Sequence, residues 1–236
     1  MATVWSIVVA GGSGSRFGAP KQFALLAGRP VLEWSVAACR TCSDGIVLVL
    51  PEDSGAATGV STVSTVPAVP ADRHGADTVV SGGPTRADSV RRGLAAVPDD
   101  AGVIVVHDAA RPLASPGLFA AVVGALGEEG VDGAVPGLMP ADTIKVVDRR
   151  GCVERTLDRS RLVAVQTPQA FRADVLRRAH EHAGPDATDD AMVVEGSGGR
   201  VKVVPGETTN LKITGPGDLG SAELFLARDV PGGQTS

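Results

Sequence analysis

The most informative segment of the sequence is Ile7-Val8-Val9-Ala10-Gly11-Gly12-Ser13-Gly14-Ser15-Arg16-Phe17-Gly18-Ala19-Pro20-Lys21-Gln22. Residues 6–10 form a nearly continuous apolar run, which predicts a strand buried on both faces. Glycines after such a strand let the backbone approach a ligand, and their successive N–H groups form a concavity that suits anions. Arg16 and Lys21 add positive charge, and the first acidic residue is Glu33. The sequence therefore predicts a phosphate-binding loop.

This loop differs from the two common phosphate-binding motifs. The Rossmann fingerprint requires G-x-G-x-x-G, but Phe17 stands where the third glycine should follow Gly12 and Gly14. The P-loop requires G-K-[ST], but Lys21 follows Pro20 and precedes a glutamine. Proline also disfavours a helix starting directly after the glycines. We therefore expect a long cationic loop, with a loop that merely connects two elements as the alternative.

The composition is that of an ordinary globular protein. The chain has 236 residues, 43% hydrophobic and 21% charged, with a net charge of −5. This charge, with five Phe, two Trp and no Tyr, argues against general nucleic-acid binding. No apolar run reaches the length of a membrane span, and the N-terminus lacks a signal-peptide pattern, so we expect a cytoplasmic protein with no membrane partner. Cys39, Cys42 and Cys152 lack the context of a redox or zinc site and are expected to be ordinary thiols.

Strands and helices alternate through the first part of the chain. The predicted strands are 6–10, 46–50, 78–80, 103–106 and 133–135, and the predicted helices are 31–39, 85–97 and 115–126. This alternation predicts a three-layer α/β/α fold with a mostly parallel sheet. Ligands bind at the carboxyl ends of the strands in such sheets. The glycine-rich loop, Gly82-Gly83 and His107-Asp108 should therefore share one rim.

The pattern changes after Pro140. Residues 142–148 alternate polar and apolar, 149–151 form a turn and 152–157 return, which predicts an antiparallel hairpin. Such an arm, about 141–160, is expected to project and pack on another copy of the chain, with a solvated arm as the alternative.

The remaining predictions complete a single domain, 1–228, followed by a disordered tail, 229–236. The expected elements are helices at 173–183, 190–195 and 218–227, strands at 201–204 and 210–214, and a variable helix or loop at 52–75. His180 and His182 are expected on a solvated helix face.

A series of short motifs then carries a family resemblance. They are Gly11-Gly12-Ser13-Gly14-Ser15-Arg16 with Pro20-Lys21-Gln22, Arg86-Ala87-Asp88-Ser89, His107-Asp108-Ala109-Ala110-Arg111-Pro112, Asp142-Thr143-Ile144-Lys145, Asp158-Arg159, Thr167-Pro168-Gln169-Ala170-Phe171, Thr188-Asp189-Asp190-Ala191 and Leu211-Lys212-Ile213-Thr214. In this order they span nearly the whole chain. The chain resembles the 2-C-methyl-D-erythritol 4-phosphate cytidylyltransferases of the non-mevalonate isoprenoid pathway. The resemblance implies a Rossmann-like fold of the nucleotide-diphospho-sugar transferase type.

The resemblance also implies the reaction and its partners. CTP and 2-C-methyl-D-erythritol 4-phosphate, a polyol phosphate, would give 4-diphosphocytidyl-2-C-methyl-D-erythritol and pyrophosphate, with Mg²⁺ as cofactor. A homodimer is implied, in which the 141–160 arm of one subunit closes the site of the other. Two alternatives stay open: a ribitol-5-phosphate cytidylyltransferase, and a catalytically idle nucleotide-binding or regulatory protein. Ala109-Ala110 favours the first reading over the ribitol enzyme.

Residue roles follow from the same match. The implied catalytic residues are Arg16, Lys21, Lys212 and Arg159; the implied nucleotide-binding residues are Ala10, Gly11, Gly12, Ser13, Gly14, Gly83, Arg86, Ser89 and Ala109. The implied substrate-binding residues are Asp108, Thr143, Arg159, Thr167 and Thr188, and Asp108 would also lie near the metal. The chemistry agrees, because a phosphate monoester with a second pKa of about 6 is already mostly a dianion at neutral pH and needs no general base. Positioned cations and a metal would stabilise the charge that develops in the transition state.

Two positions depart from the family pattern. Many members have Ala where this chain has Gly11, and some have Asp where it has Pro84. Proline offers neither an N–H nor a carboxylate, so any base contact from that side chain is lost. Neither departure affects the three cations Arg16, Lys21 and Lys212.

Overall fold

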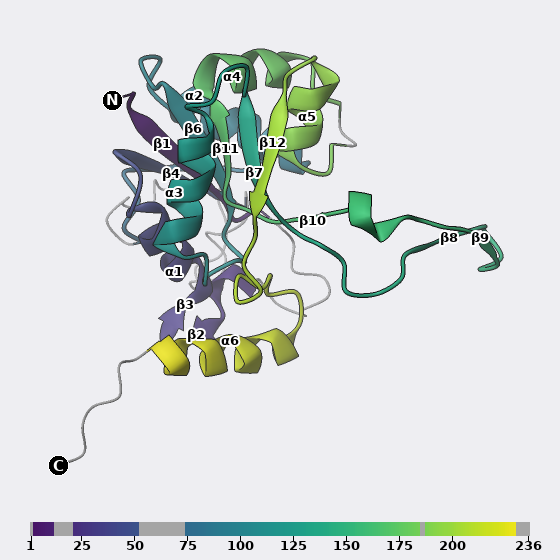
Figure 1. The fold of residues 1–236 in the computed structure, drawn as a ribbon. Helices are drawn as coiled ribbons and strands as arrows, with labels where there is room; N and C mark the ends of the chain where they lie inside the picture. Colours follow the sequence, from purple (N-terminus) through teal and green to yellow (C-terminus); the bar gives the residue numbers. More distant parts are fainter. Residues whose placement is uncertain (1, 12–20, 52–73, 185–186, 230–236) are drawn as a thin grey trace.

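A mostly parallel sheet forms the centre of the molecule (Figure 1). The structure, a computed structural model, describes residues 2–11, 21–51, 74–184 and 187–229. Within these ranges eight strands run in the order β10-β7-β11-β6-β1-β4-β5, and β12 pairs with β7. Their bounds are β1 Val4–Val9, β4 Gly45–Leu50, β5 Thr78–Ser81, β6 Val103–Asp108, β7 Gly133–Leu138, β10 Ala164–Val165, β11 Gln169–Arg172 and β12 Val201–Pro205.

The strand pairing confirms the predicted mostly parallel sheet. β1 pairs in parallel with β4 and β6, so that Ile7 stands opposite both Val47 and Val106. β4 pairs in parallel with β5, and β7 with β12. β11 is antiparallel to both β6 and β7, and β10 is antiparallel to β7. The carboxyl ends of β1 and β6 therefore reach the same rim.

Side chains of the central strands alternate between two apolar clusters, one on each face of the sheet. Val8 packs in a cluster with residues of α1 (Val31–Cys39) and α3 (Pro116–Ala125). Ile7 packs on the opposite face with residues of α2 (Arg86–Ala96), α4 (Ala173–Glu181) and α5 (Asp190–Gly196). Because both faces are covered, the three-layer prediction is confirmed.

Side-chain caps fix the starts of the helices that face the rim. Thr85 Oγ1 accepts a hydrogen bond from the Asp88 backbone N–H at 3.0 Å, and Asp88 Oδ2 accepts one from the Thr85 N–H at 3.1 Å. This capping box begins α2 where the sequence predicts it. Ser115 caps α3 with proline at the first helical position, and Asp189 caps α5, which confirms both predicted starts.

A third, smaller cluster lies beside the sheet and corrects one prediction. It joins Leu26 of β2 (Leu25–Leu26), Val31, Ile213 and Ala222 of α6 (Pro216–Asp229); β2 pairs with β3 (Arg29–Pro30). The strand predicted at 210–214 is wrong, because this segment is irregular. Ile213 is fully buried in the cluster, and its backbone N–H donates to the carbonyl of Ala110 at 2.8 Å rather than to a ladder.

A hairpin arm extends away from the body (Figure 1). β8 (Lys145–Val147) and β9 (Val153–Thr156) pair antiparallel, as the alternating pattern predicts. The pairing has a register irregularity between Val146 and Val147. Val147 and Val153 are 53% and 60% exposed, so the arm presents apolar side chains to its surroundings.

Three predictions fall wholly or mostly outside the described residues. These are the conformation of the glycine-rich loop at 12–20, most of the segment 52–75, and most of the tail at 229–236. Within the described ranges, none of the helices combines the length and apolar character that crossing a membrane requires.

Candidate active site

A cavity of about 450 Å³ opens at the carboxyl ends of β1 and β6, beside the start of α2. Several residues predicted for the site, from widely separated motifs, line it. They are Ala10, Gly11, Lys21, Gly83, Arg86, Ser89, Asp108, Ala109, Thr167, Thr188 and Lys212. Gly11, Gly83 and Asp108 therefore share one rim, as expected, because they lie at or just after the ends of parallel strands of one sheet. The rest of the glycine-rich loop lies outside the described residues.

Other predicted site residues are not placed in this cavity. Thr143 and Arg159 are exposed and lie on the arm, where Arg159 Nη1 donates to the carbonyl of Ala141. Gly12, Ser13, Gly14 and Arg16 lie outside the described residues. The cavity of a single chain thus lacks both arm residues.

Close packing around Ser89 requires small residues on one wall of the cavity. Ser89 Oγ accepts a hydrogen bond from the Gly83 N–H at 3.1 Å and donates to the Thr85 carbonyl at 3.0 Å. A Cβ atom at Gly83 would lie 2.2 Å from the Cβ of Asp88, which the capping box holds in place. A Cβ at Gly11 would lie 3.1 Å from Ser89 Oγ, tighter than ordinary contact. Gly11 and Gly83 therefore line the cavity with backbone rather than with side chains.

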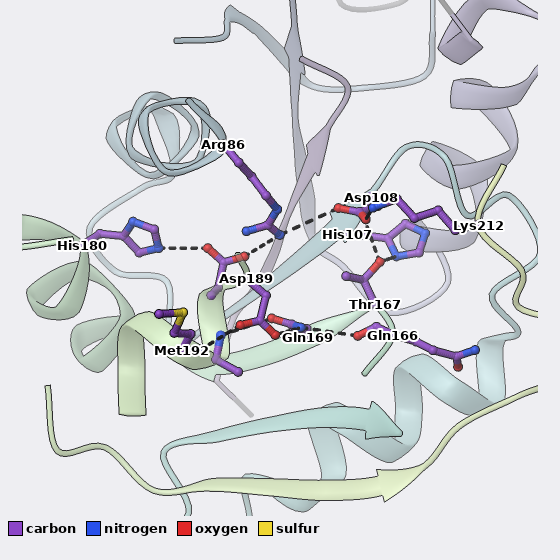
Figure 2. Close-up of polar contacts among 12 residues, drawn as sticks. Arg86, His107, Asp108, Gln166, Thr167, Gln169, His180, Asp189, Met192 and Lys212 are labelled. Carbon is purple, nitrogen blue, oxygen red and sulfur yellow. Dashed lines mark hydrogen bonds and ion pairs between the residues drawn. The ribbon is translucent and has the colours of Figure 1, made fainter. Parts of the chain in front are cut away.

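Asp108 is the charged centre of the cavity (Figure 2). Its Oδ2 accepts a hydrogen bond from Lys212 Nζ at 2.6 Å, and its Oδ1 lies 3.8 Å from Arg86 Nη2. Burial alone would raise the pKa of this carboxyl, but the Lys212 and Arg86 charges outweigh it and lower the pKa to about 2. Asp108 is therefore ionised throughout the neutral range.

His107 supports Asp108 from below the cavity floor. It is fully buried, and its Nε2 lies 3.1 Å from the Arg111 carbonyl, which can only accept. The neutral ring thus carries its proton on Nε2, and Nδ1 accepts from Thr167 Oγ1 at 3.1 Å. Thr167 Oγ1 in turn accepts from the Asp108 N–H at 3.0 Å. Burial lowers the pKa of His107 to about 4, so it is neutral at pH 7.

Lys212 lies in an irregular segment whose position is set by a network of buried hydrogen bonds. Asn210 is fully buried, and its side-chain Nδ2 donates to the backbone carbonyl of Thr167 at 2.9 Å. The backbone carbonyl of Asn210 accepts a hydrogen bond from Arg111 Nη1 at 2.8 Å. Gln166 Nε2 donates to the carbonyl of Glu207 at 2.9 Å. Arg111 and Gln166 also line the cavity. Neither is among the site residues predicted from the sequence. The position of Arg111, just beyond a strand end, was the available signal.

Arg86 connects the partly exposed Asp108 to a second carboxylate, which is fully buried. Its Nη2 lies 2.7 Å from Asp190 Oδ2, and Asp190 Oδ1 lies 2.9 Å from His180 Nε2. Asp190 is fully buried and His180 is 2% exposed. The prediction that His180 lies on a solvated face is wrong, because this face of α4 packs against α5.

The donor set suits a metal that takes most of its ligands from a substrate. Among the described residues there is no group of three or more His, Cys, Asp or Glu side chains arranged to hold a metal ion. Asp108 is a cavity carboxylate whose lowered pKa keeps it available as a ligand. Mg²⁺ commonly binds through one or two carboxylates together with phosphates and water, so Asp108 fits that role.

The chain is similar to known proteins over nearly its whole length. The family model described as IspD, 2-C-methyl-D-erythritol 4-phosphate cytidylyltransferase, matches residues 4–228. A 2-C-methyl-D-erythritol 4-phosphate cytidylyltransferase of Saccharopolyspora erythraea is 45% identical over 95% of this chain and 100% of its own length. The bifunctional enzyme IspD/IspF of Clavibacter michiganensis is 43% identical over 98% of this chain, which spans 56% of that relative.

A solved structure is similar over nearly the whole chain. The crystal structure of 2-C-methyl-D-erythritol 4-phosphate cytidylyltransferase from Thermus thermophilus superimposes with a TM-score of 0.73 at 35% identity. The match covers 97% of this chain and 100% of that one. The arm and the sheet therefore belong to one shared architecture.

Proposed function

Because the chain belongs to the 2-C-methyl-D-erythritol 4-phosphate cytidylyltransferase family, we propose that it transfers CMP from CTP to 2-C-methyl-D-erythritol 4-phosphate. The products are 4-diphosphocytidyl-2-C-methyl-D-erythritol and pyrophosphate, in the non-mevalonate route to isoprenoid precursors. The observation that carries the proposal is the convergence of Lys21, Lys212 and the Gly83 wall on one cavity. Such a cavity offers a glycine-lined surface for a nucleotide beside lysines that can bind its phosphates.

The transfer needs charge stabilisation rather than a base. An oxygen of the acceptor phosphate attacks the α-phosphorus of CTP, the bond to the β-phosphate oxygen breaks, and pyrophosphate leaves with the electron pair. The acceptor phosphate is mostly a dianion at pH 7, so no proton has to be removed. His107 is buried and already accepts through Nδ1, which supports a structural role for it. Lys21 and Lys212, with Arg16, would stabilise the charge on the α-phosphoryl oxygens and the leaving group.

The Asp108–Lys212 pair gives the acceptor end of the cavity its polarity. Lys212 is 44% exposed at its side chain, so the ammonium can turn toward a phosphate while staying near Asp108. Asp108 would then accept hydrogen bonds from the hydroxyls of the polyol. Thr188 stands at the cavity wall as a further substrate contact, whereas the Thr167 hydroxyl is already engaged with His107 and Asp108.

The nucleotide would bind against the wall formed by Gly11, Gly83 and Ser89. Gly11 and Gly83 bring backbone close to the cavity, and Ser89 holds Gly83 in position. Ala10 and Ala109 follow the ends of β1 and β6 and would flank the ribose. Recognition of the base through backbone groups suits a chain with few aromatic residues.

We propose Mg²⁺ as the cofactor. Asp108 and the CTP phosphates would hold the ion, and when bound it would neutralise charge on the phosphates. Lys21 and Lys212 would act on the same phosphates.

We also propose a homodimer built through the 141–160 arm. The arm leaves the body and exposes Val147 and Val153, whose burial against a second copy would be favourable. Thr143 and Arg159 on that arm would then hold the acceptor phosphate in the partner's cavity. A cytoplasmic location fits the use of CTP and the free thiols of Cys39, Cys42 and Cys152.

Pyrophosphate release tests the function directly. Purified protein with CTP and Mg²⁺ should release pyrophosphate with 2-C-methyl-D-erythritol 4-phosphate. Release with ribitol 5-phosphate alone would establish the rival acceptor, which the relatives named above do not support. CTP binding without release with either acceptor would establish a binding protein instead.

A further inference from the structure

Four charged or polar side chains from separate elements form a chain that ends at the acceptor side of the cavity. His180 on α4 contacts Asp190 at the start of α5 at 2.9 Å, and Asp190 contacts Arg86 on α2 at 2.7 Å. Arg86 Nη2 lies 3.8 Å from Asp108 at the end of β6 (Figure 2). Asp190 and His180 are not among the residues that line the cavity, and Arg86 is the side chain that links them to Asp108.

The distances show how the two cations are divided between the two carboxylates. Arg86 forms a close ion pair with Asp190 at 2.7 Å, whereas its nearest approach to Asp108 is 3.8 Å. Asp108 is instead bonded to Lys212 at 2.6 Å. Asp190 is fully buried, and a buried carboxylate without a partner is strongly unfavourable, so Asp190 needs the charge of Arg86.

His180 fixes the carboxylate of Asp190 in this arrangement. Its Nε2 faces Asp190 Oδ1, whereas its buried Nδ1 has no hydrogen-bond partner among the described residues. Leaving a buried ring nitrogen without a partner costs free energy. The contact between Nε2 and Asp190 is therefore the interaction that orients the ring. That bond leaves Oδ2 of Asp190 directed at Arg86.

We propose that Asp190, held by His180, is a positioning residue for cytidylyl transfer that keeps Arg86 from pairing fully with Asp108. Asp108 thereby stays bonded to Lys212 and open to the hydroxyls of the acceptor. This inference rests on the proposed function, in which Asp108 contacts the polyol. Without the Asp190 charge, Arg86 moves toward Asp108 and competes with both Lys212 and the acceptor.

The substitution Asp190→Asn keeps the shape and removes the charge. We expect the KM for 2-C-methyl-D-erythritol 4-phosphate to rise about 10-fold, the scale of a lost hydrogen bond to a charged group. The Kd for CTP, measured by calorimetry, should change less than the acceptor KM, because Arg86, which is also an implied nucleotide contact, keeps its charge in the cavity. Asp174→Asn is the matched control, since Asp174 pairs with Arg178 on the exposed side of α4; both constants should keep their wild-type values.

His180 provides a second test that does not depend on the folding of Asp190→Asn. His180→Leu should raise the acceptor KM and leave the CTP Kd unchanged, whereas His180→Gln, which retains a side-chain N–H donor, should restore the acceptor KM. An acceptor KM within twofold of wild type in both Asp190→Asn and His180→Leu would overturn the inference. Equal weakening of CTP and acceptor would also overturn it, because that pattern indicates general damage.

The proposed function is checked separately by the wild-type chain in the same assay. A wild-type chain that binds CTP but never releases pyrophosphate contradicts the function. The positioning role is then decided by the acceptor Kd of the CTP-loaded protein, which Asp190→Asn should raise and Asp174→Asn should not.

Discussion

Lys212 Nζ lies 2.6 Å from Asp108 Oδ2, although 104 residues separate the two in the sequence. Asp108 ends a central parallel strand, whereas Lys212 belongs to an irregular segment held by Asn210. Asn210 and Ile213 anchor that segment on either side of Lys212. The pair therefore sets the position of a cation in the cavity before any substrate binds.

Removing a cavity cation should slow the transfer step. Lys212→Ala and Lys21→Ala should each lower kcat by about 10²–10³-fold, the usual effect of losing one charge-stabilising donor. Lys202→Ala is the control, because Lys202 pairs with Glu128 on the surface. Steady-state pyrophosphate release measures all three, and a near-normal kcat in either cavity variant would remove that lysine from the mechanism.

The ionisation of Asp108 should appear in the acid dependence of stability. The pKa of Asp108 in the folded chain is lowered to about 2, so its charge stabilises the folded state above the ordinary carboxyl pKa. That contribution, about 2 kcal/mol, is present near neutral pH and is lost as the pH falls below about 4 toward 2. Urea unfolding of wild type and Asp108→Asn should give a difference that is constant above pH 5 and shrinks below pH 4. A difference that persists unchanged to pH 3 would contradict the lowered pKa.

The glycine wall of the cavity should not tolerate a side chain. Gly83→Ala places a Cβ 2.2 Å from the Asp88 Cβ, so the wall or the start of α2 must shift. We expect CTP affinity to fall about 10-fold, with a loss of about 1–3 kcal/mol in unfolding free energy typical of overpacking. Gly124→Ala is the control, since a Cβ at that position on α3 would meet nothing within 4 Å among the described residues. Equal CTP affinity in both variants would show that Gly83 is not close to the nucleotide.

The arm should govern both assembly and acceptor binding. Combined Val147→Asp and Val153→Asp substitutions place charges on its exposed apolar side chains and should convert a dimer to monomers in sedimentation velocity. Leu224→Asp, at a residue of α6 that is 69% exposed, is the matched control and should leave the sedimentation coefficient unchanged. A wild-type chain that sediments as a monomer at micromolar concentration would contradict the proposed dimer.

Arg159 tests whether the arm contributes to acceptor binding. Arg159→Ala should chiefly raise the KM for the acceptor, because the arm is proposed to hold the acceptor phosphate. A defect confined to the KM for CTP would show that Arg159 is placed wrongly.

Local patterns predicted the elements that carry their own signals. Thr85 with Asp88, and Ser115 with Pro116, mark helix starts through short-range hydrogen bonds, so the sequence contains the whole cause. The run around Ile7 is apolar on both faces because helices cover both, which is also visible in the sequence. The motif matches then identified most of the cavity wall.

Features set by distant contacts were not predictable in this way. The apolar alternation in 210–214 suggests a strand, but Asn210 and Ile213 find their partners in distant segments instead of in a strand ladder. His180 looks like a solvated residue until Asp190, ten residues later, is placed beside it. The antiparallel insertion of β11 between β6 and β7 likewise depends on tertiary pairing and not on local pattern.

The identity of the cytidylylated product shows whether the protein is a cytidylyltransferase and which acceptor it uses. Wild-type protein should be supplied with CTP, Mg²⁺ and equal amounts of 2-C-methyl-D-erythritol 4-phosphate and ribitol 5-phosphate, and the products identified by mass spectrometry. We expect 4-diphosphocytidyl-2-C-methyl-D-erythritol and pyrophosphate in equal amounts. Cytidine diphosphate ribitol as the main product, or no cytidylylated product at all, would contradict it.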